Sequence, residues 1–332
     1  MNVFARGSLE VVAWLGAATM LSLPAPARAC GTCRGASDTG SAFTAPDERW
    51  SLSLGSLARY ETGTWDATGR FHAEPSRVSA WDVTGQLALG VRIVRPIELA
   101  VMAGAGVARL SAPGLESVTT GLTDLTLRTR VDVLADDPSQ PSRPAVGTWF
   151  TVRAPMGSVG TATPGGGTAA VGAFGLGAWE VAVGGDVRRT FAERWQPFLA
   201  VEGAVRAPDR SLGVPRALGP RMGIRTGITW FASDVVAFSA LADLALEGDA
   251  ALGGENVPNS WQQRVGVGLA ATARVPNGLR FSLATWADVP VDAMGRNGSA
   301  TLRLAFAIGY ASPEPAWRAC PAGHHGMTMA MR

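Results

Sequence analysis

The chain has 332 residues, of which 47% are hydrophobic and 17% charged, and its 29 basic residues are all arginine. Soluble proteins carry about 25% charged residues, so this chain is unusually poor in charge. Its net charge of +2 and the lack of any basic run exclude a nucleic-acid-binding protein. The apolar content and the 41 glycines without a collagen period exclude a disordered or collagen-like chain.

The first 29 residues have the three parts of an export signal. Arg6 supplies a positive charge, residues 11–23 form a short apolar stretch, and Ala27-Arg28-Ala29 matches a small-residue cleavage site. We therefore predict a signal peptide that is cleaved after Ala29. A lipid anchor on Cys30, which would become the first residue, is the alternative.

Beyond the signal, the hydrophobic pattern has a period of two. From Trp81 to Arg95, apolar and polar residues alternate, as they do in a strand with one apolar face. Most of the segments with this pattern reach the roughly 9–11 residues that a tilted membrane-spanning strand needs. The twelve predicted strands are 49–60, 80–94, 97–110, 122–134, 145–154, 172–187, 197–206, 220–231, 234–246, 262–274, 278–288 and 299–310.

The connections between these segments alternate in length. Links after odd-numbered segments are long, such as 111–121 and 155–171, whereas links after even-numbered segments are mostly short, such as Arg95-Pro96 and Ser233. Outer-membrane barrels have long outer loops and short periplasmic turns. The sequence therefore predicts an all-β protein, a closed antiparallel transmembrane β-barrel of about 12 strands with both termini in the periplasm. A soluble β-sandwich is the alternative, but its strands are normally shorter.

Aromatic residues gather near the strand ends, as in the interfacial girdles of membrane barrels. Two positions, Trp149 and Trp179, fall within predicted strands and do not fit a girdle. The predicted girdle residues are Trp81, Trp261 and Trp286 at the long-loop ends, and Trp50, Trp230, Phe231 and Tyr310 at the short-turn ends.

These patterns divide the exported chain into four parts. The predicted parts are a signal peptide over 1–29, a periplasmic segment over 30–48, a barrel over 49–310 and a periplasmic tail over 311–332. The barrel would lie in the outer membrane of a Gram-negative bacterium, in contact with its lipid. The segment over 30–48 lies either in the periplasm or within the lumen. No sequence motif indicates a protein partner.

The more polar parity of the strands carries charges of both signs. These charges either set the selectivity of a lumen, with a preference for anions near the arginines, or neutralise one another inside a narrow barrel. The candidate lumen-facing residues are Arg92, Asp124, Arg128, Arg130, Asp132, Arg225, Arg264 and Arg303.

The two predicted periplasmic ends carry soft metal ligands. Thiolate and imidazole groups bind copper(I) or zinc, and in a closed barrel the first and last strands are neighbours. A disulfide and a frayed tail are the alternative, because a lone C-x-x-C is a weak motif. The candidate ligands are Cys30, Cys33, Cys320, His324 and His325.

An enzyme is not expected. His72, in the first long link, is the only histidine before the tail, although general-base catalysis at neutral pH most often uses histidine. No G-x-S-x-G or H-E-x-x-H motif occurs. Apart from copper or zinc at the termini, the sequence indicates no cofactor.

Four short segments resemble a family of outer-membrane channels described as the MetA-pathway phenol-degradation type. They are Thr120–Leu127, Val152–Gly157, the glycine-rich stretch from Gly172 to Gly185, and Ala29-Cys30-Gly31-Thr32-Cys33. The chain departs from the family pattern at Thr123, where glycine is common, and at Arg153, where lysine is common. The resemblance implies a channel or transporter but does not fix its solute.

These observations together predict a barrel that passes small solutes of hydrophobic, aromatic or anionic character. The alternative is a barrel-anchored periplasmic protein that binds or senses metal through its cysteine-, histidine- and methionine-rich ends.

Overall fold

The computed structural model describes residues 48–135, 143–157, 174–192, 194–209, 215–275 and 277–313. The predicted signal peptide, and the candidate metal ligands Cys30, Cys33, Cys320, His324 and His325, lie outside these described residues. No helix long and apolar enough to cross a membrane occurs within the described ranges.

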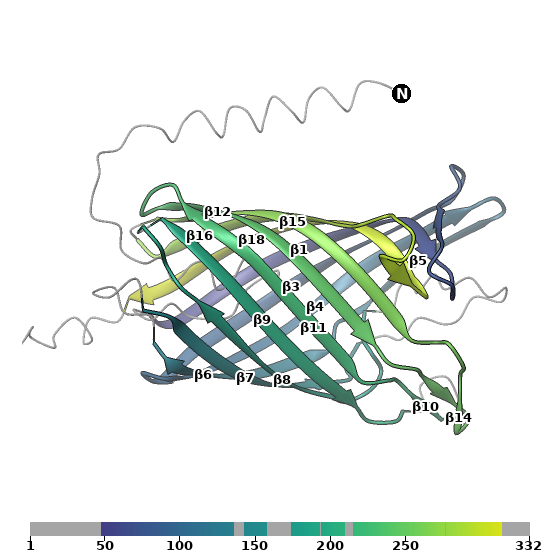
Figure 1. Ribbon diagram of the computed structural model, residues 1–332, viewed down its shortest axis with the longest axis horizontal. Coiled ribbons are helices and arrows are strands. Elements are labelled where there is room, and N and C mark those ends of the chain that lie inside the picture. The colour runs from purple at the N-terminus through teal and green to yellow at the C-terminus, as the bar shows by residue number, and fades with distance from the viewer. Residues whose placement is uncertain are drawn as a thin grey trace, which may run out of the picture.

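Twelve long antiparallel strands form a tilted, closed barrel (Figure 1). The sheet runs in the order β12-β11-β9-β8-β7-β6-β4-β3-β1-β18-β16-β15, and pairing of β15 with β12 closes it. The predicted all-β architecture, a closed antiparallel barrel of 12 strands, is confirmed. The wall strands are β1 (Glu48–Trp65), β3 (Ser79–Val94), β4 (Ile97–Ala112), β6 (Leu125–Leu134), β7 (Ala145–Ala154), β8 (Glu180–Arg188), β9 (Trp195–Arg206), β11 (Arg221–Phe231), β12 (Val236–Glu247), β15 (Gln262–Arg274), β16 (Leu279–Asp288) and β18 (Gly298–Pro313).

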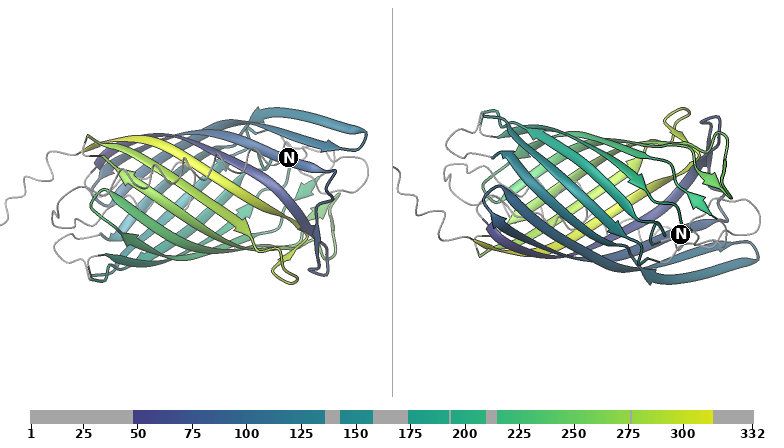
Figure 2. Two further views of the ribbon diagram at one scale, coloured as in Figure 1. Left: turned by 90° about the horizontal axis from the view of Figure 1, so that it is seen from above. Right: turned by 90° about the horizontal axis from the view of Figure 1, so that it is seen from below.

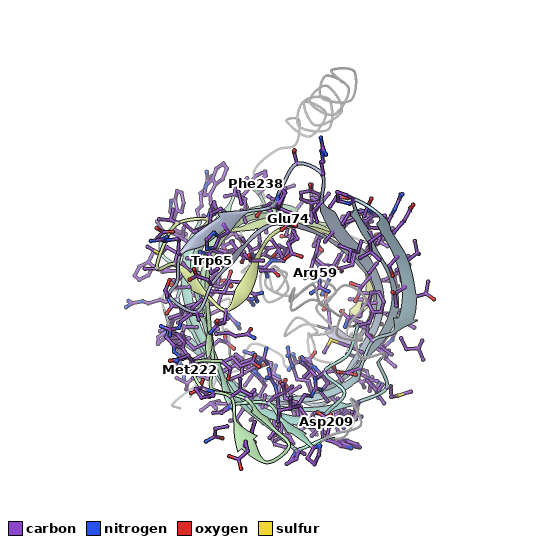
Figure 3. All side chains as sticks on the ribbon, turned by 90° about the vertical axis from the view of Figure 1, so that its right-hand side faces the viewer. Arg59, Trp65, Glu74, Asp209, Met222 and Phe238 are labelled. Atoms are coloured by element: carbon purple, nitrogen blue, oxygen red, sulfur yellow. The ribbon has the colours of Figure 1, made fainter. Side chains whose placement is uncertain are left out.

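Alternation along each strand separates an apolar outer face from a mixed inner face. Along β6, Leu127, Val131 and Val133 are exposed, whereas Arg130 and Asp132 on the opposite parity are buried. The same division holds on β18, where Leu304 and Phe306 are exposed and Ala305 is buried. Because strand side chains alternate between faces, the exposed aliphatic parity is the outer wall. Figure 3, viewed from the long-loop end, shows Arg59 inside the ring of strands and Phe238 on its outer side.

A girdle of aromatic side chains lies at the short-turn end of β1, β18, β9, β11 and β12. The ring centroids of Trp50 and Tyr310 lie 5.5 Å apart on the neighbouring strands β1 and β18. Trp230 stacks with Trp195 at 6.2 Å and with Phe238 at 5.8 Å. These exposed rings are what a membrane interface favours.

Two residues predicted for the girdles point inward instead. Trp286 is 6% exposed and packs with Leu241 and Ala284 on the inner face, and Phe231 is also 6% exposed. Both lie on the inward parity of their strands. Their prediction as girdle residues was wrong because it used only their position near a strand end and not their parity. Trp179, in contrast, is exposed immediately before β8 begins.

The predicted strand over 172–187 is wrong in its first part. Strand β8 begins only at Glu180, and the described residues 174–179 are not in a strand. Alternating Gly and Ala in this stretch resemble a strand in sequence, but the backbone N–H of Leu176 bonds a carboxylate, as described below, and not a neighbouring strand.

The predicted loop over 111–121 is also wrong, because strand β5 (Leu115–Leu122) folds back on β4. Gly114 has φ +75°, which suits the tight turn between them. The β4–β5 hairpin extends beyond the rim of the barrel (Figure 2). The remaining short strands at this end are β2 (Phe71–Ala73), β10 (Arg216–Ala217), β13 (Ala251–Leu252), β14 (Glu255–Asn256) and β17 (Gly295–Arg296).

Candidate functional site on the inner wall

A buried group of charges covers the inner wall at the short-turn end of β3, β4, β6 and β8. Arg92 pairs with Glu98 at 3.3 Å and with Asp132 at 3.4 Å. Arg130 pairs with Asp132 at 3.0 Å and with Asp186 at 2.5 Å. Their side chains are almost fully buried, so each buried charge has an opposite charge beside it, as low dielectric requires.

A second charged group lies at the long-loop end of β7, β8, β9, β11 and β12. Buried Glu180 accepts from Arg153 at 3.0 Å, from Arg206 at 2.9 Å and from Arg221 at 3.2 Å. Arg206 also reaches Glu247 at 2.5 Å. Three guanidinium groups thus share one carboxylate, and Glu247 offsets part of the excess positive charge.

A third group lies on β15, β16, β18 and β1. Asp288 is fully buried and pairs with Arg303 at 2.5 Å and with Arg264 at 3.6 Å. On the next strands, Arg59 pairs with Asp82 at 2.9 Å. The side chains of Arg264 and Arg59 remain 41% and 39% exposed although they lie on the inner face. Water therefore reaches this part of the barrel interior.

Arg225 and Arg128 are the remaining arginines predicted for the lumen. Arg225 stands opposite Asp243 in the ladder between β11 and β12. Arg128 donates to Thr151 Oγ1 at 2.9 Å and lies 3.8 Å from a carboxylate oxygen of Glu202. Both lie on the inward parity of their strands.

Between the charged groups, the inner wall carries an apolar cluster. Buried Leu241, Ala270, Ala284, Trp286 and Ala305 pack together on four consecutive strands, and Leu57 and Phe198 pack against them. This cluster lies toward the short-turn end from the Asp288 group, because Ala284 precedes Asp288 by four residues on β16. The inner wall therefore alternates between paired charges and apolar surface along the barrel.

The carboxylate of Asp124, which was also predicted to face the lumen, bonds two loop segments. It accepts the backbone N–H of Gly157 at 2.9 Å and of Leu176 at 2.7 Å. The residue is buried at the break between β5 and β6, so its charge serves to hold two loop segments. Three of the segments that carry the sequence resemblance, around Asp124, Gly157 and Leu176, thus meet at one point.

His72 is the only histidine among the described residues, and it lies on the loop strand β2 beyond the barrel wall. Its Nε2 lies 3.0 Å from a carboxylate oxygen of Asp66. Hydrogen bonds from the Thr68 hydroxyl, from His72 and from the Arg70 backbone hold the pKa of Asp66 below its usual range. Among the residues that the structure describes, no group of three or more His, Cys, Asp or Glu could hold a metal ion.

The inner-wall partners Glu180, Glu247 and Arg206 were not singled out from the sequence. The inward parity of the strands over 197–206 and 234–246 would have identified Arg206 and extended to Glu247. Glu180 lies within the predicted strand over 172–187, and its parity would have placed it on the inner face as well.

No protein-family model matches the chain, and no curated protein matches it. Its fold is similar to that of solved outer-membrane barrels. An outer-membrane channel from Pseudomonas putida F1 superposes with a TM-score of 0.66 at 14% identity, covering 83% of this chain and 99% of that one. The translocator domain of the autotransporter NalP from Neisseria meningitidis gives 0.46 at 12% identity, covering 84% and 91%. The KdgM porin gives 0.40 at 8% identity, covering 78% and 98%.

The chain is an outer-membrane β-barrel. The shared architecture, the apolar outer wall and the aromatic girdle agree with the location predicted from the sequence.

Proposed function

We propose that this barrel is a channel for small solutes, and that its inner wall lines the solute path. The observation that carries the proposal is the water exposure of charged side chains inside a closed barrel. Arg59 and Arg264 keep about two-fifths of their side-chain surface exposed on the inner face. By analogy with other barrels, the short turns and both termini would face the periplasm and the long loops would face outward.

The pairing of the inner charges favours uncharged solutes over anions. Arg92, Arg130, Arg264 and Arg303 each lie within 3.6 Å of a carboxylate oxygen. A paired arginine presents little net field to a passing ion, since its partner cancels most of the potential beyond a few ångströms. The apolar cluster around Leu241 offers contact to solutes with hydrophobic or aromatic parts.

Ion current through single barrels in planar bilayers tests the proposal. We expect the wild-type barrel to conduct with weak selectivity between cations and anions. Asp82→Asn removes the partner of exposed Arg59 and should shift the reversal potential toward anion selectivity. Asp66→Asn, the same charge change on a loop, is the matched control and should shift it far less.

A barrel that inserts but passes neither ions nor small uncharged solutes would contradict the proposal. Equal reversal potentials for Asp82→Asn and Asp66→Asn would show that Arg59 does not face the conducting path.

We infer no catalytic role. His72 and Asp66 form an exposed pair on a loop, and the solved barrel from Pseudomonas putida F1 is a channel.

A further inference from the structure

Trp149 has an unusual place for a tryptophan of a membrane barrel. It lies near the middle of β7 on the inward parity and is not part of the aromatic girdle at the short-turn end. The ladder aligns it with Arg130 on β6 and with Gly184 on β8, and Gly184 is aligned in turn with Glu202 on β9. These four residues form one row across four neighbouring strands.

The indole of Trp149 spans this row and lies over Gly184. Its Nε1 donates to Glu202 Oε2 at 2.9 Å, although β7 and β9 are separated by β8. Neighbouring strands lie about 4.8 Å apart, so the ring must extend along the wall to reach a strand two places away. The guanidinium of Arg130 lies 5.9 Å from the ring centroid on the other side of the row.

Only glycine at position 184 leaves room for this arrangement. A Cβ built on Gly184 would lie 2.4 Å, 2.5 Å and 2.6 Å from three atoms of the Trp149 indole, and these are its closest contacts. Real Cβ atoms essentially never approach so closely. The clash involves a side chain and not the backbone, so the ring would have to turn away from the wall.

The next position of the row carries no side chain. Gly223 continues the row on β11, opposite Glu202, and a Cβ built there meets no atom within 4 Å. Gly223 is on the inward parity of its strand, as is half-buried Arg221 two residues before it, which pairs with Glu202 at 2.7 Å. The inner wall opposite Glu202 therefore has open space at Gly223.

Other inner-wall aromatic rings lie over glycines as well. Trp286 lies against Gly268 and Phe198 against Gly227, with built Cβ contacts of 2.4 Å and 2.9 Å to the rings. At both of those glycines a backbone carbonyl also crowds the built Cβ, whereas at Gly184 the three nearest atoms are all in the ring. Of these three glycines, Gly184 is thus the one where ring placement can be changed with the least effect on the wall.

We propose that Trp149 determines the bore of the channel, with Gly184 and Glu202 as the positioning residues that hold its ring flat against the wall. The inference rests on the proposed channel function. A flat indole leaves the centre of the lumen free, whereas an indole turned inward would narrow it.

Single-channel conductance of Gly184→Ala tests the bore. The added methyl group should turn the indole into the lumen. The conductance should then fall, and the largest neutral sugar that can pass should be smaller. Gly203→Ala is the matched control, because Gly203 lies on the next strand, faces outward and has no atom within 4 Å of its built Cβ. Trp149→Ala should raise the conductance above that of the wild type.

The double variant Trp149→Ala/Gly184→Ala separates ring displacement from wall distortion. If the ring causes the loss, the double variant should conduct at least as well as the wild type. A loss that persists without the indole would overturn the proposal. Equal conductance of Gly184→Ala and Gly203→Ala would also overturn it.

A measurement that needs no conduction tests ring placement alone. In protein labelled with 5-fluorotryptophan, the ¹⁹F resonance that disappears in Trp149→Phe identifies Trp149. This resonance should shift in Gly184→Ala and Glu202→Ala and stay in place in Gly203→Ala. If it stays in place in all three, Gly184 and Glu202 do not position the ring. If the wild type passes no current while the resonance shifts as expected, the channel function fails and the ring placement stands.

Discussion

Adjacent residues of one strand meet opposite environments in this barrel. Leu127 of β6 is 42% exposed on the outer wall, whereas the side chain of Arg128 is 12% exposed and bonds Thr151. The two residues are consecutive in the sequence, but their side chains lie on opposite faces of the barrel wall. An exchange between a charged and an apolar residue should therefore lower the free energy of unfolding by different amounts at the two positions.

We expect Leu127→Arg to lower the free energy of unfolding in lipid by roughly 2–4 kcal/mol, because it places a charge in hydrocarbon near mid-strand. Arg128→Leu should cost less, because it replaces a partly paired inner charge with a residue that the inner wall tolerates elsewhere, as at Leu57. Equilibrium unfolding of both variants in lipid vesicles, monitored by tryptophan fluorescence, measures the difference. Equal losses would show that the two faces of β6 are assigned wrongly.

The sequence allowed the face of most inner residues to be predicted, but not their partners. A period of two places Arg92 and Asp132 on the inner face regardless of how the strands are aligned. Their contact at 3.4 Å depends on the stagger of β3, β4 and β6, which alternation alone does not specify. The role of Asp124 was missed for the same reason, since its partners Gly157 and Leu176 come from loops.

At the scale of elements, β5 and β6 act as one long strand with a break. Both pair with β4, and the N–H of Thr123 in the break still bonds Gly104 O at 2.8 Å. Asp124 follows at once and turns its carboxylate to the ends of two loops. Long strands with clear alternation were predictable here, whereas the β4–β5 hairpin was hidden by a turn rich in small and polar residues.

Asp124→Ala should release these two loop ends without opening the barrel. Loss of a charged acceptor costs about 1.5–3 kcal/mol per hydrogen bond, so exchange of the Gly157 and Leu176 amide protons should accelerate by roughly tenfold or more. Hydrogen–deuterium exchange read by NMR measures both amides, and those of β15, far from Asp124, serve as internal controls. Unchanged protection at Gly157 and Leu176 would show that Asp124 does not hold them.

At the scale of the whole molecule, closure joins elements that are distant in sequence. β1 pairs with β18 from Trp50↔Ser312 to Trp65↔Gly298, and β12 pairs with β15 from Val236↔Ala273 to Glu247↔Gln262. Every wall strand therefore has a partner on both sides, and no sheet edge is left along the wall. In hydrocarbon, such closure is required because an unpaired backbone group costs several kcal/mol.

Closure predicts a characteristic response to detergent. The folded barrel should resist SDS and migrate differently on a gel before and after boiling, because its backbone hydrogen bonds are satisfied internally. Ala305→Pro should abolish the heat-sensitive form, since Ala305 lies between Leu57 of β1 and Ala284 of β16, where proline cannot donate to the ladder. Ala305→Ser, which keeps the backbone N–H, is the control and should retain that form. A proline variant that still shows the wild-type mobility shift would mean that the seam at β18 is not part of a continuous wall.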